Sequence, residues 1–124
     1  MKTNTMKLLE SIQNNQMSTV SIWQVPNGAE SREYRFRTYD EVKEVPFDEL
    51  IKRYKNVGTI PSIDITSYDT IDDFLEATYV AGNDGVLFGY FKPKHSIRSL
   101  SVGDIIQVDN DYYYIDSSGF VKLN

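Results

Sequence analysis

The spacing of apolar residues along the chain changes from strand-like to helical and back again. In residues 19–26, Thr-Val-Ser-Ile-Trp-Gln-Val-Pro, alternate positions share a face, with Val20 and Ile22 on one side and Trp23 on the other. We therefore predict a strand here, which the following Asn-Gly pair ends with a turn.

Aromatic and basic residues alternate in the next segment, Arg-Glu-Tyr-Arg-Phe-Arg-Thr-Tyr over residues 32–39. This alternation predicts a second strand, or a strand that runs into a turn. Thr38 or Asp40 then caps a short helix over Asp40–Glu44.

Residues 47–55 have helical spacing. Their apolar side chains recur at i, i+3, i+4 and i+7, namely Phe47, Leu50, Ile51 and Tyr54. Acidic residues come early in this segment and basic residues late, which suits the helix dipole. The pattern predicts an amphipathic helix.

The strongest helical pattern spans residues 67–82. Thr70 and Asp73 form a capping-box-like pair near its start, and we expect Gly82 to end the helix. The predicted buried stripe consists of Ile71, Phe74, Leu75 and Thr78 or Tyr79.

The remaining segments predict strands and loops. Residues 59–65 read as a short strand, which Pro61 places at a sheet edge or a strand start. Residues 83–98 are irregular, and we expect a turn, a short strand and a loop there. The C-terminal hairpin consists of a strand over 105–109, a turn at Asn110-Asp111, a returning strand over 112–116, a break over 117–119 and a closing segment over 120–123.

These elements predict an α+β fold: a small, mostly antiparallel sheet, two or three helices packed on one side, and a C-terminal β-hairpin. A chain of 124 residues has the length of one domain. We assign residues 18–124 to that domain and residues 1–17 to a polar N-terminal arm or short helix.

Composition and charge exclude several classes of site and function. The chain has no cysteine, which excludes disulfides and thiolate metal sites. Its 13 Lys+Arg against 18 Asp+Glu give a net charge of −5, which argues against binding nucleic acid by neutralising phosphates. No apolar run has the length of a membrane span or the form of a signal peptide. We expect a cytoplasmic protein with no membrane insertion.

Residues that often carry chemistry do not combine into a catalytic pattern. The single histidine, His95, has no nucleophile elbow beside it, and Asp72, Asp73 and Glu76 fall on the outer face of the predicted helix. The acidic turn of the hairpin lacks the glycine and glutamate of a calcium loop. We expect no catalytic residue, no cofactor and no metal site. The chain also holds one cluster of basic residues, for which contact with a phosphate, contact with an acidic partner and exposure to solvent alone are the alternatives. Its members are Lys92, Lys94, His95 and Arg98.

The hairpin holds the candidate contact residues. Its tyrosines alternate, so one face joins the core and the other displays tyrosine beside carboxylates, with cross-strand packing as the alternative. The candidate partner-binding residues are Asp109, Asp111, Tyr112, Tyr114 and Asp116. The bends around the hairpin hold residues that suit backbone hydrogen bonds, positive φ or the core, and we give these a structural role: Ser99, Ser101, Gly103, Asp104, Gly119 and Phe120.

The segment Ser-Leu-Ser-Val-Gly-Asp-Ile-Ile-Gln-Val, followed by Tyr-Tyr-Tyr-Ile-Asp-Ser-Ser-Gly-Phe, resembles the C-terminal signature of YodL-like domains. Upstream, Val-Ser-Ile-Trp-Gln-Val and Tyr-Arg-Phe-Arg-Thr-Tyr-Asp resemble the opening of that family. The resemblance spans roughly residues 20–123, although residues 80–101 are longer than the family's compact junction and differ from it.

The resemblance implies a protein of phages, plasmids or conjugative elements, from a family for which no enzymatic activity is established. Small members of that family look like effectors that act by binding a host protein. The sharpest hypothesis is an anti-defence inhibitor of the anti-CRISPR or anti-restriction type. Its acidic surface would occupy the nucleic-acid groove of a nuclease or other defence effector. The alternative is a modulator of a host cytoskeletal or cell-envelope protein, or an accessory module for element transfer. Direct binding of nucleic acid is not expected, and the oligomeric state is left open.

Overall fold

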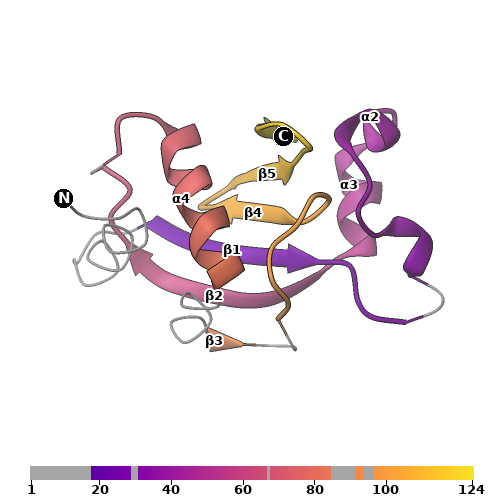
Figure 1. The fold of residues 1–124 in the computed structure, drawn as a ribbon, viewed down its shortest axis with the longest axis horizontal. Helices are drawn as coiled ribbons and strands as arrows, with labels where there is room; N and C mark the ends of the chain where they lie inside the picture. The colour runs from indigo at the N-terminus through magenta and orange to yellow at the C-terminus, as the bar shows by residue number, and fades with distance from the viewer. Residues whose placement is uncertain (1–17, 29–30, 67, 85–91, 94–96) are drawn as a thin grey trace.

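The computed structural model describes residues 18–28, 31–66, 68–84, 92–93 and 97–124. Its antiparallel sheet has the strand order β3-β2-β1-β4-β5-β6 (Figure 1). The strands are β1 (Ser18–Gln24), β2 (Lys55–Ile63), β3 (Lys92–Pro93), β4 (Ile105–Val108), β5 (Asp111–Ile115) and β6 (Phe120–Lys122). The helices are the 3₁₀ helix η1 (Arg32–Tyr34), α2 (Tyr39–Val42), α3 (Phe47–Leu50), the 3₁₀ helix η2 (Ile51–Arg53) and α4 (Ile71–Asp84). The predicted α+β class, antiparallel sheet and C-terminal hairpin are confirmed.

The central strand β1 lies between β2 and β4, with Val20 and Ile22 on one face and Thr19, Ser21 and Trp23 on the other. On one face Val20 and Ile22 pack with Phe74 and Leu75 of α4 in the larger core cluster. These side chains are almost fully buried, and each such side chain contributes about 1.5–3 kcal/mol of hydrophobic stabilisation. The alternation predicted for this strand therefore places its apolar residues against α4.

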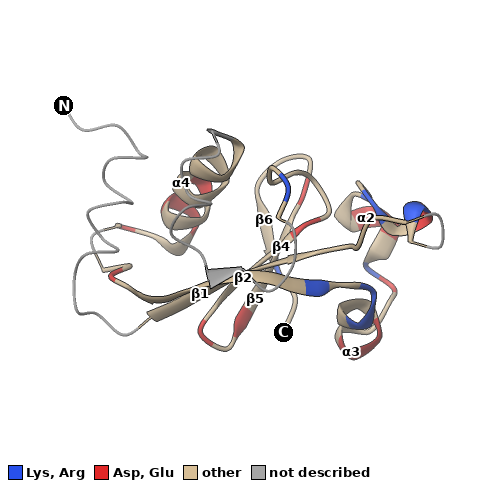
Figure 2. Cartoon of the chain, turned by 90° about the horizontal axis from the view of Figure 1, so that it is seen from below, with Lys and Arg blue, Asp and Glu red and all other residues tan. Residues whose placement is uncertain are grey.

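A second cluster covers the opposite face. There Ile105 of β4 and Tyr114 of β5 pack with Val42 of α2 and Leu50 of α3. Figure 2, turned by 90° from Figure 1, shows α4 and α3 on opposite sides of the sheet. The helices are thus divided between the two faces, a difference from the one-sided layer that we expected, because β4 and β5 carry apolar residues on both faces.

The α4 helix begins as predicted but ends later. The Thr70 hydroxyl accepts the backbone N–H of Asp73 at 3.1 Å, which satisfies one donor of the first turn. The prediction that Gly82 ends the helix is wrong, since α4 continues to Asp84. Gly82 instead allows a close approach: a Cβ there would lie 2.5 Å from Cδ1 of Leu100.

The predicted strand over residues 32–39 is also wrong. The structure has η1 there, followed by a turn in which Phe36 has a φ of 61°. Both edges of β1 are already occupied by β2 and β4, so this segment cannot form a hairpin with the strand that precedes it. The short helix after it is present as α2, and Thr38 at its N-cap donates its backbone N–H to the Glu41 carboxylate at 3.0 Å.

Three further predictions hold with shifted boundaries. The helix predicted over residues 47–55 is present as α3 and η2, and it ends at Arg53. The strand predicted over residues 59–65 is longer, as β2, and it lies between β3 and β1. Pro61 is nevertheless outside the pairing with β3, which extends only to Gly58 and Thr59. The hairpin turn lies one residue earlier than predicted, because Val108 pairs with Asp111.

Among the described residues, no helix has the length and apolar character needed to cross a membrane. The predicted N-terminal arm, residues 1–17, lies outside the described residues, and so do most of residues 83–98.

Candidate functional site

A buried carboxyl group organises the region where the end of β1 meets the start of β4. Asp104 precedes β4 and is only 6% exposed. Its Oδ2 accepts the backbone N–H of Ser101 at 3.0 Å and the side-chain amide of Gln24 at 3.1 Å. Gln24, the last residue of β1, is itself buried. The carboxyl group thus ties the turn at 101–104 to the central strand.

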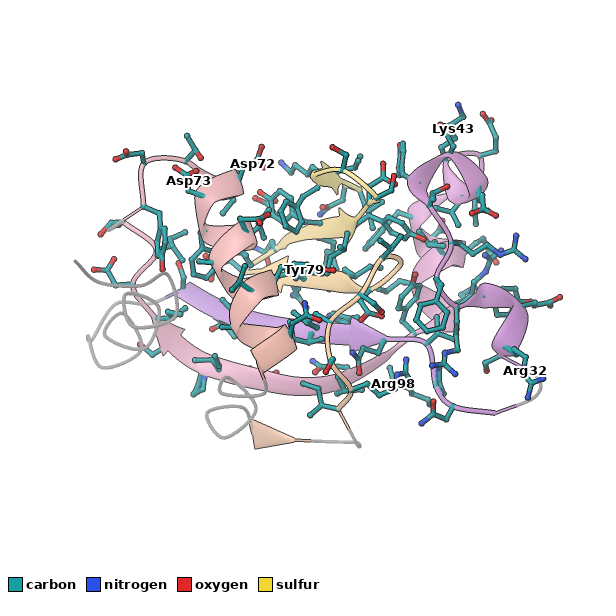
Figure 3. The ribbon with its side chains drawn as sticks, viewed as in Figure 1. Arg32, Lys43, Asp72, Asp73, Tyr79 and Arg98 are labelled. Carbon is teal, nitrogen blue, oxygen red and sulfur yellow. The ribbon has the colours of Figure 1, made fainter. Side chains whose placement is uncertain are left out.

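The same glutamine fixes Arg98. Its Nε2 donates to the carbonyl oxygen of Arg98 at 3.0 Å, and its Oε1 accepts the backbone N–H of Arg98 at 3.0 Å. The Arg98 guanidinium donates to Oδ1 of Asn27 at 2.7 Å and to the carbonyl oxygen of Val25 at 2.8 Å. Figure 3 shows Arg98 on the segment that leads to β4, beside the end of β1. Backbone and side chain of Arg98 are therefore both held in place.

The electrostatics of this region reflect burial and like charges. Burial raises the pKa of Asp104 to about 6, and the hydrogen bonds from Ser101 and Gln24 only partly oppose that rise. Burial also lowers the pKa of Arg98, and the nearby positive charge of Arg35 lowers it further. The Arg35 Nε is buried without a hydrogen-bond partner among the described residues. Perturbed groups of this kind often lie near functional sites.

Two hollows open beside Lys55, and Arg98 lines the smaller one. The smaller, of about 180 Å³, has an apolar wall of Val25, Pro26 and Val57 and a polar wall of Gln24, Asn27, Lys55 and Arg98. The larger, of about 520 Å³, is lined by Pro26, Ser31, Tyr34, Glu49, Lys52, Arg53, Tyr54 and Lys55. They share Pro26 and Lys55, and basic residues dominate the charged lining of both.

A loop with an exposed aromatic residue lies next to this region. Phe36 is 61% exposed and has left-handed backbone geometry, with the Arg35 guanidinium 4.8 Å from the centre of its ring. Gly103, at a φ of 93°, packs against this loop: a Cβ there would lie 3.1 Å from the backbone nitrogen of Arg37. The Tyr114 hydroxyl donates to the carbonyl oxygen of Arg37 at 2.6 Å. The fold thus holds an apolar side chain in a strained, solvent-facing position.

The predicted partner-binding residues of the hairpin all have contacts within the chain. Oδ1 of Asp109 accepts the backbone N–H of Thr19 at 3.0 Å, and Asp111 forms an ion pair with Lys122 at 3.6 Å. Oδ1 of Asp116 accepts the backbone N–H of Tyr39 at 2.9 Å. These carboxylates hold the hairpin to its neighbours, whatever else they contact.

The structure corrects the expectation of an exposed tyrosine face. Tyr114 is 0% exposed, because α2 and α3 cover it, and Tyr112 is half-buried against Trp23 and Phe47. Tyr113, on the other face, is 8% exposed beneath the α4 side of the sheet. Both faces of the hairpin therefore pack into the core, which is the cross-strand alternative.

The motif residues lie at bends. Ser101 and Asp104 form a turn in which the Asp104 N–H also donates to the Ser101 carbonyl at 3.1 Å. Gly119 has a φ of 79°, and its carbonyl oxygen accepts the Asp116 N–H at 3.1 Å. Phe120 packs partly buried against the larger core, while Ser99 is exposed.

The sequence reasoning missed Gln24 and Phe36 as site residues. An amide at a core-facing position of a strand was the available signal for Gln24, since a buried amide requires polar partners. Of the predicted basic cluster, the side chain of Arg98 alone is described; those of Lys92, Lys94 and His95 lie outside the described part of the chain.

Acidic side chains gather at the opposite end of the molecule. Asp72, Asp73 and Glu76 are exposed on α4, and Figure 3 shows Asp72 and Asp73 projecting from its first turn. Burial raises the pKa of Tyr113, and the charges of Asp111 and Asp72 raise it further, so carboxylates of the hairpin and of the helix both lie near this tyrosine. Within the described ranges, no three His, Cys, Asp or Glu side chains are grouped closely enough to hold a metal ion.

Among known proteins, no family model, curated sequence or solved structure matches this chain.

Proposed function

We propose that this chain is a non-enzymatic, YodL-like protein of a mobile genetic element that binds and inhibits a host protein in the cytoplasm. Its partner is a defence effector that binds nucleic acid, of the CRISPR or restriction type. The acidic surface of α4 and the hairpin docks in the basic groove where that effector holds DNA or RNA. Carboxylates stand in for phosphates in such a complex.

The observation that carries this proposal is an excess of acidic charge at one end of the molecule. Asp72, Asp73 and Glu76 on α4 lie there near Asp111 of the hairpin, and residues 64–76 contain no lysine or arginine. At the other end, around α2, α3 and the start of β2, basic and acidic residues are interspersed and their charges nearly cancel (Figure 2). A surface whose charges have one sign attracts a partner surface of opposite charge and sets the orientation in which the two proteins meet.

The resemblance of the C-terminal signature to YodL-like domains adds the mobile-element context. A second candidate surface is the loop around Phe36, where an exposed aromatic side chain is flanked by Arg35 and Arg37. Aromatic and arginine residues are enriched at the centres of protein interfaces. This surface favours the alternative function, a modulator of a host cytoskeletal or cell-envelope protein.

A matched pair of charge variants tests the proposal. The triple variant D72N/D73N/E76Q neutralises the α4 surface, and E33Q/E44Q/D48N removes the same charge from exposed positions at the other end. Each is used with the wild type in a pull-down from host lysate at low and high salt, and the retained proteins are identified by mass spectrometry. We expect the wild type to retain a nuclease or defence effector that high salt releases. The α4 triple variant should retain less of it, because the loss of electrostatic steering slows association by roughly tenfold.

Three results would contradict the proposal. Equal loss in both triple variants would attribute binding to net charge rather than to the α4 surface. Retention that resists salt and is lost in Phe36→Ala would assign the contact to the loop and favour the alternative function. Retention of no protein at either salt concentration would remove the basis for both binding functions.

A further inference from the structure

The pair of hollows near Arg98 supplies a second site, independent of the acidic surface. Because they share Pro26 and Lys55, a ligand that lies over Lys55 can extend into both. The smaller hollow adds Arg98 to its lining, and the larger adds Lys52 and Arg53. A chain with a net charge of −5 thus places four basic side chains on the lining of these two hollows, and Glu49 is the one acidic residue on that lining.

Arg98 is pre-organised to bind an anion. Its backbone is paired with the buried amide of Gln24, and its guanidinium donates to two neutral acceptors, Oδ1 of Asn27 and the carbonyl oxygen of Val25. A guanidinium has five N–H donors, so donors remain for a ligand after these two bonds. Both of these acceptors are neutral, although the charge of Asp104 nearby favours the protonated guanidinium.

The other cations of the hollows differ in how they are paired. Ion pairs between described residues join Arg37 to Glu41, Lys43 to Asp40, Lys52 to Glu49 and Lys122 to Asp111. Neither Lys55 nor Arg98 takes part in such a pair, and Arg53 lies over the ring of Tyr34 instead. Arg98 also faces the like charge of Arg35, which disfavours its charged form, and the carboxyl group of Asp104, which favours it. An anion in the smaller hollow would offset the repulsion between the two arginines.

We propose that Lys55 and Arg98 bind the phosphate group of a small phosphorylated molecule in the smaller hollow. The fork of the arginine and the point charge of the lysine are the two side chains that most often bind phosphate. Val25 and Val57 bound the site on its apolar side, and Arg53 in the larger hollow receives a second phosphate. The ligand class is therefore a molecule with a chain of two or more phosphates.

Titration with pyrophosphate, followed by NMR of the ¹⁵N-labelled protein, tests the site. We expect the largest shifts at the amides of Gln24, Lys55 and Arg98. Lys55→Gln should weaken binding by roughly tenfold, because one charge-assisted hydrogen bond is lost at an exposed strand position. Lys43→Gln is the matched control, since Lys43 is an exposed lysine on neither hollow and should leave the affinity unchanged.

Parallel titrations with adenosine diphosphate and with citrate identify the source of the anion. Tighter binding of the nucleotide than of pyrophosphate indicates a nucleotide, and equal binding indicates the phosphate chain alone. No localised shift with pyrophosphate, equal weakening in Lys43→Gln, or citrate binding as tight as pyrophosphate would overturn the proposal. Arg98→Lys keeps the charge but not the fork, and we expect it to lower the affinity for pyrophosphate.

Discussion

Asp104 shows how much of a site depends on a single side chain. A buried carboxylate requires donors to replace the water that it loses, and two N–H groups supply part of that replacement. Burial nevertheless raises its pKa to about 6, from an ordinary value of 3.8. Because the folded-state pKa is the higher one, the folded protein binds this proton more tightly than the unfolded chain does. The stability that the protonated group contributes is full below the ordinary pKa and is lost as the pH rises through about 6.

Asp104→Asn removes this ionisation and keeps an acceptor for the two N–H donors. We expect the free energy of unfolding of the wild type to fall, relative to that of the variant, by on the order of 2–3 kcal/mol between about pH 4 and pH 7. Urea unfolding of both proteins across this range measures the difference. The surface carboxylates titrate alike in both proteins, so their contribution cancels. Parallel stability curves would show that Asp104 does not have a raised pKa.

At the scale of elements, α4 depends on one close contact with the segment that leads to β4. A Cβ on Gly82 would lie 2.5 Å from Cδ1 and 2.6 Å from Cγ of Leu100, which is almost fully buried and cannot easily move away. Gly82→Ala gains helix propensity of about 1 kcal/mol, but overpacking of a core costs about 1–3 kcal/mol. We expect a net destabilisation of up to about 2 kcal/mol, measured by chemical denaturation.

A double-mutant cycle with Leu100→Ala separates the two effects. In the Leu100→Ala background the clashing atoms are gone, so Gly82→Ala should be neutral or stabilising. The same cost in both backgrounds would mean that Leu100 is not the reason for the glycine.

The elements that the sequence predicts well are those with local signals. The Thr70 cap and the apolar stripe define the start of α4, and the alternation around the turn at Asp109 defines the hairpin. The strand predicted over residues 32–39 fails because its pattern is local while the pairing partners of β1 are set by distant segments. Asp104 was identified as a turn residue, but its bond to Gln24 joins positions 80 residues apart, and no local pattern predicts that.

At the scale of the whole molecule, two core clusters share one sheet. Val20 and Ile106 belong to the cluster under α4, whereas Ile105 and Tyr114 belong to the cluster under α2 and α3. Because β4 contributes neighbouring residues to both, neither cluster can be lost without disturbing the strand pairing of the other. The molecule should therefore unfold as one cooperative unit, as most small single domains do.

Two probes on opposite faces test this cooperativity. Trp23, the single tryptophan, packs beside Tyr112 on the α3 face, while α4 is the longest helix and lies on the other face. Leu50→Ala opens a cavity on the α3 face and should lower the free energy of unfolding by about 2–5 kcal/mol. We expect tryptophan fluorescence and far-ultraviolet ellipticity to shift together in the variant, with coincident transitions. A fluorescence transition that precedes the ellipticity change would show that the α3 face unfolds separately, and it would make the two clusters independent units.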